Sequence, residues 1–137
     1  MSDPLKGPLV EANVWPVHDY NDHDRAIARL LDDRALTYDT ETTGVDFHDD
    51  VRLVQFGDET DAYVFDPHQF PELAIKLADH PTKICHNAPF DSLHLARLTG
   101  RPVAEVIDGT LDTMILAHLV DPRDKLDGGT GRGLKEL

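Results

Sequence analysis

The chain has 137 residues, of which 40% are hydrophobic, and a formal net charge of −13. This length fits one compact domain, and the acidic excess excludes a general phosphate-binding coat, which would need Lys and Arg. No apolar run approaches the roughly 18 residues that span a bilayer, and a single cysteine, Cys85, suits a reducing compartment. We therefore expect a cytoplasmic globular domain that makes no membrane contact.

The first half of the chain predicts one helix followed by three strands. Residues 1–20 are irregular, with a short strand near Val14, and an amphipathic helix follows over 21–33, capped by Asn21 or Asp22. The predicted strands are 35–42, 51–57 and 61–66. The last two are joined by a three-residue loop, which is typical of an antiparallel hairpin.

The second half predicts helices that alternate with short strands. These elements are a helix at 69–80, a strand at 82–86, a helix at 88–99, a short strand within 103–109 and a helix at 113–120. Asn87 and Asp112 are placed to cap the helices that follow them, and Gly100 ends the helix before it. The order predicts an α/β fold: a mixed sheet, first antiparallel and then parallel, with helices on its faces.

Asp39 and Glu41 stand two residues apart in the predicted strand 35–42, so their side chains face the same side. Two adjacent carboxylates repel each other, and no Lys or Arg follows Asp39 within ten residues. The occupant that their oxygens favour is a hard divalent cation such as Mg²⁺ or Mn²⁺. The alternative interpretation is an edge strand whose carboxylates face water.

Asn87 and Asp91 lie one turn apart at the start of the predicted helix 88–99. Ligand crevices in α/β sheets form at the carboxyl ends of strands, and strand 82–86 leads directly into this helix. If that strand lies parallel beside strand 35–42, Asp91 faces the pair of acids. Local roles also account for both residues, as an N-cap and as an acid that favours the helix dipole.

Two segments carry a resemblance to a known family. "YDTETTGVD" (38–46) and "CHNAPFDSLHL" (85–95) resemble the first and second motifs of DEDD-type 3′–5′ exonucleases, more narrowly the proofreading domain of family A (polymerase I-type) DNA polymerases. "DTMILAHLVDP" (112–122) is similar to the next helix of that family, and the amino-acid sequence of these segments resembles that of phage-encoded members. The resemblance covers residues from about 35 to 137 and implies an RNase H-like fold.

The resemblance also implies a mechanism, in which two Mg²⁺ or Mn²⁺ ions hydrolyse the terminal phosphodiester of single-stranded DNA. By matching position, Asp39 bridges both ions, Glu41 completes one of them and touches the terminal 3′-hydroxyl, and Asp91 holds the second. The implied substrate contacts are Thr42, Val45, Asn87 and Phe90. The implied partners are a single-stranded DNA 3′ end and the polymerase domain of a longer chain.

One part of the family pattern is missing from the sequence. The third motif, a Tyr or His followed by a fourth carboxylate, belongs after "GLKEL", whereas the last tyrosine here is Tyr63. Leu134 and Leu137 stand at helix spacing with nothing after them to pack against. We therefore expect residues 21–137 to be a partial exonuclease domain that is weak or inactive alone. A fragment or split product of a polymerase is the favoured interpretation, and a natural short form is the alternative.

Other chemistry has less support. The eight histidines form no H-x-x-x-H pair, there is no C-x-x-C pair, and the glycines of 128–133 match no phosphate loop. The aromatic residues are scattered along the chain, which argues against a base-stacking surface. Two alternative functions stay open: a catalytically incomplete module that binds nucleic acid or a partner protein, and a DEDD exonuclease that processes RNA.

Overall fold

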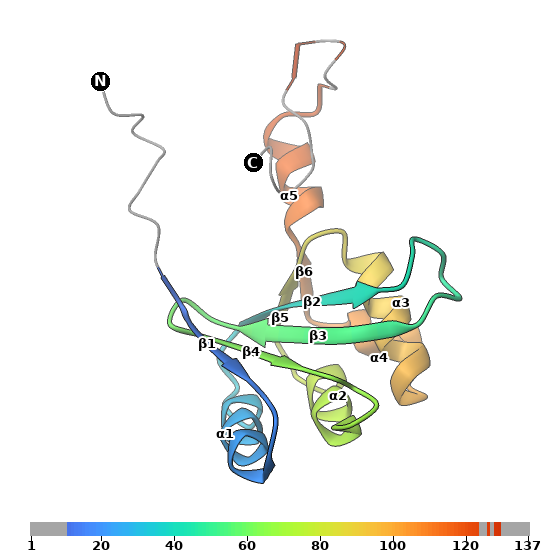
Figure 1. Ribbon diagram of the computed structural model, residues 1–137. Coiled ribbons are helices and arrows are strands. Elements are labelled where there is room, and N and C mark those ends of the chain that lie inside the picture. Colours follow the sequence, from blue (N-terminus) through green and yellow to red (C-terminus); the bar gives the residue numbers. More distant parts are fainter. Residues whose placement is uncertain (1–10, 124–125, 127, 130–137) are drawn as a thin grey trace.

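The computed structural model describes residues 11–123, 126, 128 and 129 (Figure 1). In chain order the elements are β1 (Asn13–Pro16), α1 (Tyr20–Leu30), β2 (Leu36–Thr42), β3 (Val51–Gly57), β4 (Asp61–Phe65), α2 (Pro71–Ala78), β5 (Lys83–Cys85), α3 (Ala88–Thr99), α4 (Val103–Ile107), β6 (Thr110–Asp112) and α5 (Thr113–Val120). Within the described residues, no helix is both long enough and apolar enough to cross a membrane.

The strands form one mixed sheet in the order β1-β4-β3-β2-β5-β6. β2, β3 and β4 are antiparallel neighbours, whereas β5 runs parallel to β2, and β6 runs parallel to β5. The predicted α/β fold, with an antiparallel and a parallel half, is therefore confirmed. The strand predicted near Val14 is also present as β1, which pairs in parallel with β4 at the edge of the sheet.

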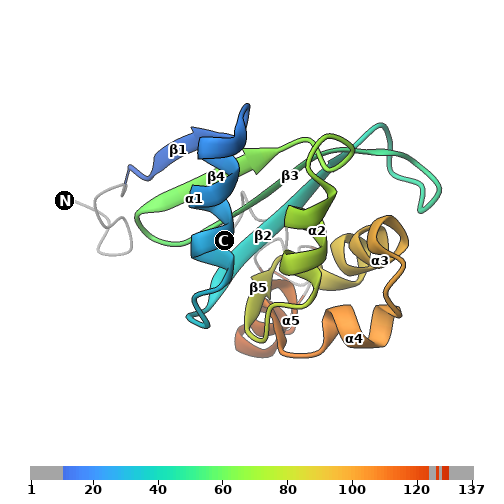
Figure 2. The same ribbon diagram turned by 90° about the horizontal axis from the view of Figure 1, so that it is seen from below.

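Helices cover one face of this sheet and leave much of the other face open. α1 and α2 lie beneath the strands with α3 beside them, while α5 rises on the opposite side (Figures 1 and 2). The burial of side chains along β2 alternates accordingly. Leu36, Tyr38 and Thr40 are buried, and the residues between them are exposed. Hence a strand in the middle of the sheet presents its polar side chains on the open face.

The predictions for the cap of α1 and for the segment 103–109 are wrong. The cap of α1 is Asp19, whose side chain accepts a hydrogen bond from the Asp22 amide, and neither Asn21 nor Asp22 takes that role. The strand predicted within 103–109 is the helix α4, because Pro102 (φ −59°) sets the chain for a helical start. Val106 is fully buried from that short helix, so tertiary packing overrides the strand preference of its β-branched valines.

An ion pair joins α1 to the turn between β3 and β4. The Arg29 side chain is largely buried, and its Nε donates to Asp58 Oδ2 at 2.8 Å. Asp58 also accepts from the backbone amides of Thr60 and Asp61. The Thr60 amide and the Arg29 guanidinium hold the pKa of the Asp58 carboxyl well below its ordinary value, because both stabilise the ionised form.

We expect Asp58→Asn to lower the free energy of unfolding at pH 7 by about 1–3 kcal/mol, because it leaves the buried Arg29 without a counter-charge. A lowered pKa contributes stability above the ordinary value of 3.8, and that contribution is lost as the pH falls through the folded-state pKa. Urea titrations at pH 7 and pH 3 should therefore show the difference shrinking in acid. The exposed pair of Asp32 and Arg34 supplies the control, since Asp32→Asn should change little.

Candidate active site

Asp39 and Glu41 lie on the open face of β2, where both are exposed. β2 has β3 on one side and β5 on the other, so it is not an edge strand of the sheet, although both carboxylates are exposed, as the alternative interpretation expects. Gln55 stands opposite Asp39 on β3, and its Nε2 donates to Asp39 Oδ2 at 2.9 Å. Within the part of the chain that the structure describes, no Lys or Arg pairs with either acid.

Asp91 approaches the same strand from the first turn of α3 and is only 3% exposed. β5 pairs with β2 only as far as Thr37, so β2 runs on beyond it without a strand neighbour on that side. Asp91 fills this gap, where its Oδ1 accepts from the Thr40 backbone amide at 2.9 Å and from the Thr40 hydroxyl. The third predicted acid thus takes the place of a strand partner for β2. It bonds to Thr40, the residue between Asp39 and Glu41.

The surroundings of Asp91 favour its protonated form. Burial raises the pKa of this carboxyl, and the negative charge of Asp39 raises it further, against the opposing effect of the hydrogen bonds from Thr40. Its other oxygen, Oδ2, meets the buried Cys85 thiol at 3.4 Å, a weak donor. Burial also raises the pKa of Cys85, so this thiol stays protonated, as expected for a structural cysteine.

The donor chemistry around β2 fits a hard cation, although the carboxylates are not gathered into one ligand set. Asp39 and Glu41 offer paired carboxylate oxygens, which Mg²⁺ and Mn²⁺ prefer. Asp91 lies close enough for the charge of Asp39 to affect its pKa, and one of its oxygens has only the thiol as its recorded partner. Across the described residues, however, no three His, Cys, Asp or Glu side chains are arranged to hold a metal ion.

Asn87 precedes α3 in a left-handed conformation with φ +60°, and its side chain makes no capping hydrogen bond. The predicted side-chain cap is therefore wrong, and the amides at this helix start are bound by Asp112 instead. Asp112 Oδ1 accepts from the Asn87 amide at 3.1 Å, and Oδ2 accepts from the Ala88 amide at 2.9 Å. The same carboxylate caps α5 through the Met114 amide, as predicted, so one buried acid joins the starts of two helices.

We expect Asp112→Ala to lower the free energy of unfolding by about 1–3 kcal/mol, because it leaves three backbone amides without an acceptor. Asp112→Asn retains one oxygen and should lose less. Chemical denaturation of both variants measures the effect. An alanine variant as stable as the parent would show that these amides find other partners.

The remaining predicted substrate contacts sit beside the end of β2. The Thr42 hydroxyl donates to the Gly44 carbonyl, and Val45, in the loop 43–50, is 93% exposed. Phe90 lies on α3 next to Asp91, and its ring is 4.6 Å from that of His94. Thr42 and Val45 thus come from the segment after Glu41, while Phe90 and Asn87 come from the start of α3.

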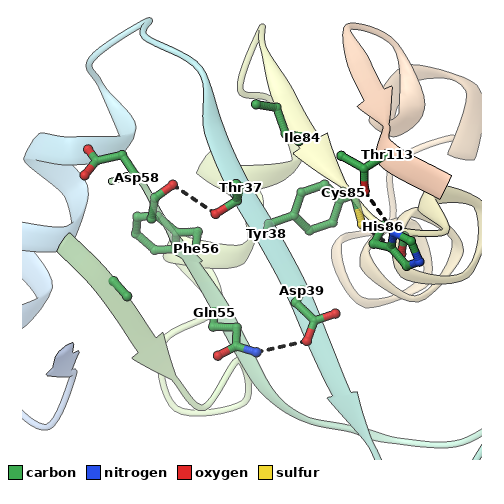
Figure 3. A pocket seen from close by; sticks show the side chains of 12 residues that line it. Thr37, Tyr38, Asp39, Gln55, Phe56, Asp58, Ile84, Cys85, His86 and Thr113 are labelled. Atoms are coloured by element: carbon green, nitrogen blue, oxygen red, sulfur yellow. Dashed lines mark hydrogen bonds between the residues drawn. The ribbon is translucent and has the colours of Figure 1, made fainter. Parts of the chain in front are cut away.

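A cavity of about 380 Å³ opens on the same face of the sheet, next to Asp39 (Figure 3). Its polar rim includes Asp39 with its partner Gln55, and His86, whose ring bonds to the Thr113 hydroxyl at 2.9 Å. Its lining residues are Thr37, Tyr38, Asp39, Gln55, Phe56, Gly57, Asp58, Ala62, Ile84, Cys85, His86 and Thr113. The exposed acid on β2 therefore borders a hollow of a size that suits small ligands.

Sequence reasoning missed the roles that Gln55, Thr40 and Asp112 have in shaping this site. Gln55 could have been found from the register of the predicted antiparallel strands, because it pairs directly with Asp39. Nothing in the sequence marked Thr40, because its hydrogen bonds to Asp91 form only where β5 no longer pairs with β2. Asp112 was predicted as a cap, but its bonds to the start of α3 depend on tertiary structure alone.

The structure thus has a mixed α/β sheet with two exposed acids on a central strand, and a buried acid on the adjoining helix. The profile of a family described as "3′-5′ exonuclease" matches residues 14–137. The chain belongs to this family, whose members include the 3′–5′ exonuclease domains of family A DNA polymerases.

Individual relatives agree with this assignment. The chain is 38% identical over 140 residues to a DNA polymerase of Mycobacterium phage L5 and 35% identical over 142 residues to one of Mycobacterium phage D29. Each match covers 97% of this chain but only 23% of the relative. The catalytic core of RRP6 from Trypanosoma brucei has a similar fold, with a TM-score of 0.63 at 21% identity over 80% of this chain and 31% of that one.

Proposed function

We propose that the chain removes nucleotides from the 3′ end of single-stranded DNA, as the proofreading part of a DNA polymerase. The observation that carries this proposal is the pair of exposed carboxylates, Asp39 and Glu41, on a central strand whose Thr40 amide is hydrogen-bonded to Asp91. The phage relatives, which are DNA polymerases about four times as long as this chain, support the substrate class and a polymerase domain as partner.

In this proposal Asp39, Glu41 and Asp91 would hold Mg²⁺ or Mn²⁺, and such an ion would supply activation of water and stabilisation of the leaving 3′-oxygen. Gln55 orients Asp39 through its amide, and Thr40 fixes Asp91 through two hydrogen bonds. Burial, and after it the negative charge of Asp39, raises the pKa of Asp91, so this carboxyl holds its proton to a higher pH than an exposed aspartate does.

The predicted substrate contacts complete the site in this proposal. Thr42 and Val45 would face the terminal nucleotide from the segment that follows Glu41, and Asn87 and Phe90 would face it from the start of α3. Val45 is suited to such a contact because its apolar side chain is almost entirely exposed. Asn87 is suited because its amide side chain is exposed and is not used as a helix cap.

The test is hydrolysis of 5′-labelled oligonucleotides of one sequence, offered as single-stranded DNA, as duplex DNA and as RNA, with Mg²⁺, with Mn²⁺ and with a chelator. We expect stepwise shortening from the 3′ end, fastest for single-stranded DNA and absent with the chelator. Faster loss of RNA would move the substrate class to RNA. Binding without shortening would instead support a catalytically incomplete binding module.

A further inference from the structure

The loop between β2 and β3 is tied down by its own residues. The Thr43 amide donates to the Asp50 carbonyl, and the Asp46 amide donates to the Asp49 side chain. A Cβ at Gly44 would meet the end of the Asp49 side chain, so this side chain packs closely against the turn. The loop 43–50 is thus a compact unit that directly follows the acidic strand.

Arg97 fastens this loop to α3. Its guanidinium donates from Nη1 to the Phe47 carbonyl and from Nη2 to the Asp49 carbonyl. A planar guanidinium with two donors in a fixed fork holds two acceptors in one geometry, which a single ammonium group does not do. The position of Phe47 relative to α3 is therefore set by a side chain six residues after Asp91 on the same helix.

The result is an aromatic surface that the spacing of these residues along the chain does not indicate. The Phe47 and Phe90 rings lie 6.2 Å apart between centroids, and both rings contact the buried His94. Phe47 is nevertheless 53% exposed, although its loop is otherwise rich in charged residues. A hollow of about 620 Å³ adjoins it, lined in part by Leu93, Ala96 and Arg97.

We propose that Phe47 and Phe90 form a stacking surface for a base of single-stranded DNA, and that Arg97 is the positioning residue that holds Phe47 in place. Exposed aromatic rings stack on bases of any sequence. Phe90 adjoins Asp91 in the chain, and the loop of Phe47 begins two residues after Glu41, so the surface borders the proposed site. This proposal rests on the proposed function, and it adds Phe47 and Arg97 to the residues that determine substrate binding.

The experiment measures both binding and turnover of the full 137-residue chain with a short oligothymidylate in Mg²⁺. Fluorescence anisotropy gives Kd for a substrate whose terminal linkage is a phosphorothioate, and a 5′-labelled normal substrate gives KM and kcat. We expect Phe47→Ala to raise Kd and KM by about 5- to 150-fold, the usual effect of losing one stacked base. We expect kcat to stay within about twofold and Phe47→Trp to restore binding.

Arg97 is tested through its dependence on Phe47. Arg97→Ala should weaken binding in the same way, while the double variant should bind no more weakly than Phe47→Ala alone, because Arg97 acts through that ring. Tyr20→Ala and Arg25→Ala are matched controls, since they remove an exposed aromatic residue and an exposed arginine on α1. Both controls should bind like the parent chain.

Several outcomes would overturn this proposal. The first is a Phe47→Ala chain that binds as tightly as the parent chain. The second is a Phe47→Leu chain that binds as tightly as the Phe47→Trp chain. The third is a double variant whose loss of binding equals the sum of the losses in the two single variants. The proposed function fails separately: a parent chain that binds DNA through Phe47 but never shortens it would refute exonuclease activity and leave the stacking surface intact. A parent chain that neither binds nor shortens DNA would refute both.

Discussion

Replacing Asp39 with alanine should reduce metal-dependent hydrolysis of single-stranded DNA by more than about 100-fold. Asp39 is the exposed acid that both borders the cavity and affects the pKa of Asp91, so its loss removes the centre of the proposed ligand set. Loss of a group that merely supports a metal ligand typically costs about 10- to 100-fold in activity or affinity, and a ligand itself should cost more. Single-turnover assays in Mg²⁺ and Mn²⁺ measure the effect.

Gln55 provides the matched comparison, because it touches Asp39 but offers no carboxylate. Gln55→Ala should fall in the 10- to 100-fold range and should be partly rescued by a higher metal concentration. Asp58→Asn, at the other end of the same cavity, should leave turnover nearly unchanged at a temperature where it is folded. An Asp39→Ala chain that shortens DNA at the parental rate would contradict the proposed metal site.

Replacing Asp91 with asparagine should raise stability while it removes activity. The folded-state pKa of this carboxyl lies above its ordinary value of 3.8, so the folded chain binds the proton more tightly than the unfolded chain. The stability that this group contributes is therefore greatest below pH 3.8 and falls as the pH rises through the folded-state pKa. Asparagine cannot ionise, and its oxygen can still accept from Thr40, so the variant escapes that loss.

We expect a gain on the order of 1 kcal/mol at neutral pH, or about 2–8 °C in the melting midpoint, which disappears near pH 3. Thermal unfolding across this pH range, without added metal, measures it. Asp91→Ala is the control, and it should be destabilised by about 1–3 kcal/mol because the Thr40 amide and hydroxyl lose their acceptor. An asparagine variant less stable than the parent at pH 7 would contradict this account of the buried carboxyl.

The sequence predicted those parts of the fold and the site that depend on local periodicity. The two-residue spacing of Asp39 and Glu41 correctly placed both on one face of β2, because alternation is a property of any strand. The strand–helix order predicted a parallel half of the sheet, and β5 does run parallel to β2. Helix α4 was missed, because the burial of Val106 against the rest of the fold decides its structure.

Other features depend on contacts between distant segments and left no local pattern. Asp91 was expected to face Asp39 and Glu41, but its hydrogen bonds go to Thr40, because β5 is too short to cover that part of β2. Phe47 and Phe90 are 43 positions apart, and their contact depends on two carbonyl groups that Arg97 binds. Backbone acceptors of this kind are present at every residue, so no sequence motif marks the ones that are used.

The carboxylate of Asp112 makes the first turn of α3 and the first turn of α5 a single mechanical unit. If the end of β6 that carries Asp112 leaves the sheet, Asn87, Ala88 and Met114 lose their acceptor together, and the helix that carries Asp91 loses an anchor. Hydrogen exchange at Asn87, Ala88 and Met114 should therefore proceed through one shared opening event, at a common rate. Any contact that shifts Asp112 would in this way loosen or tighten the helix that carries Asp91.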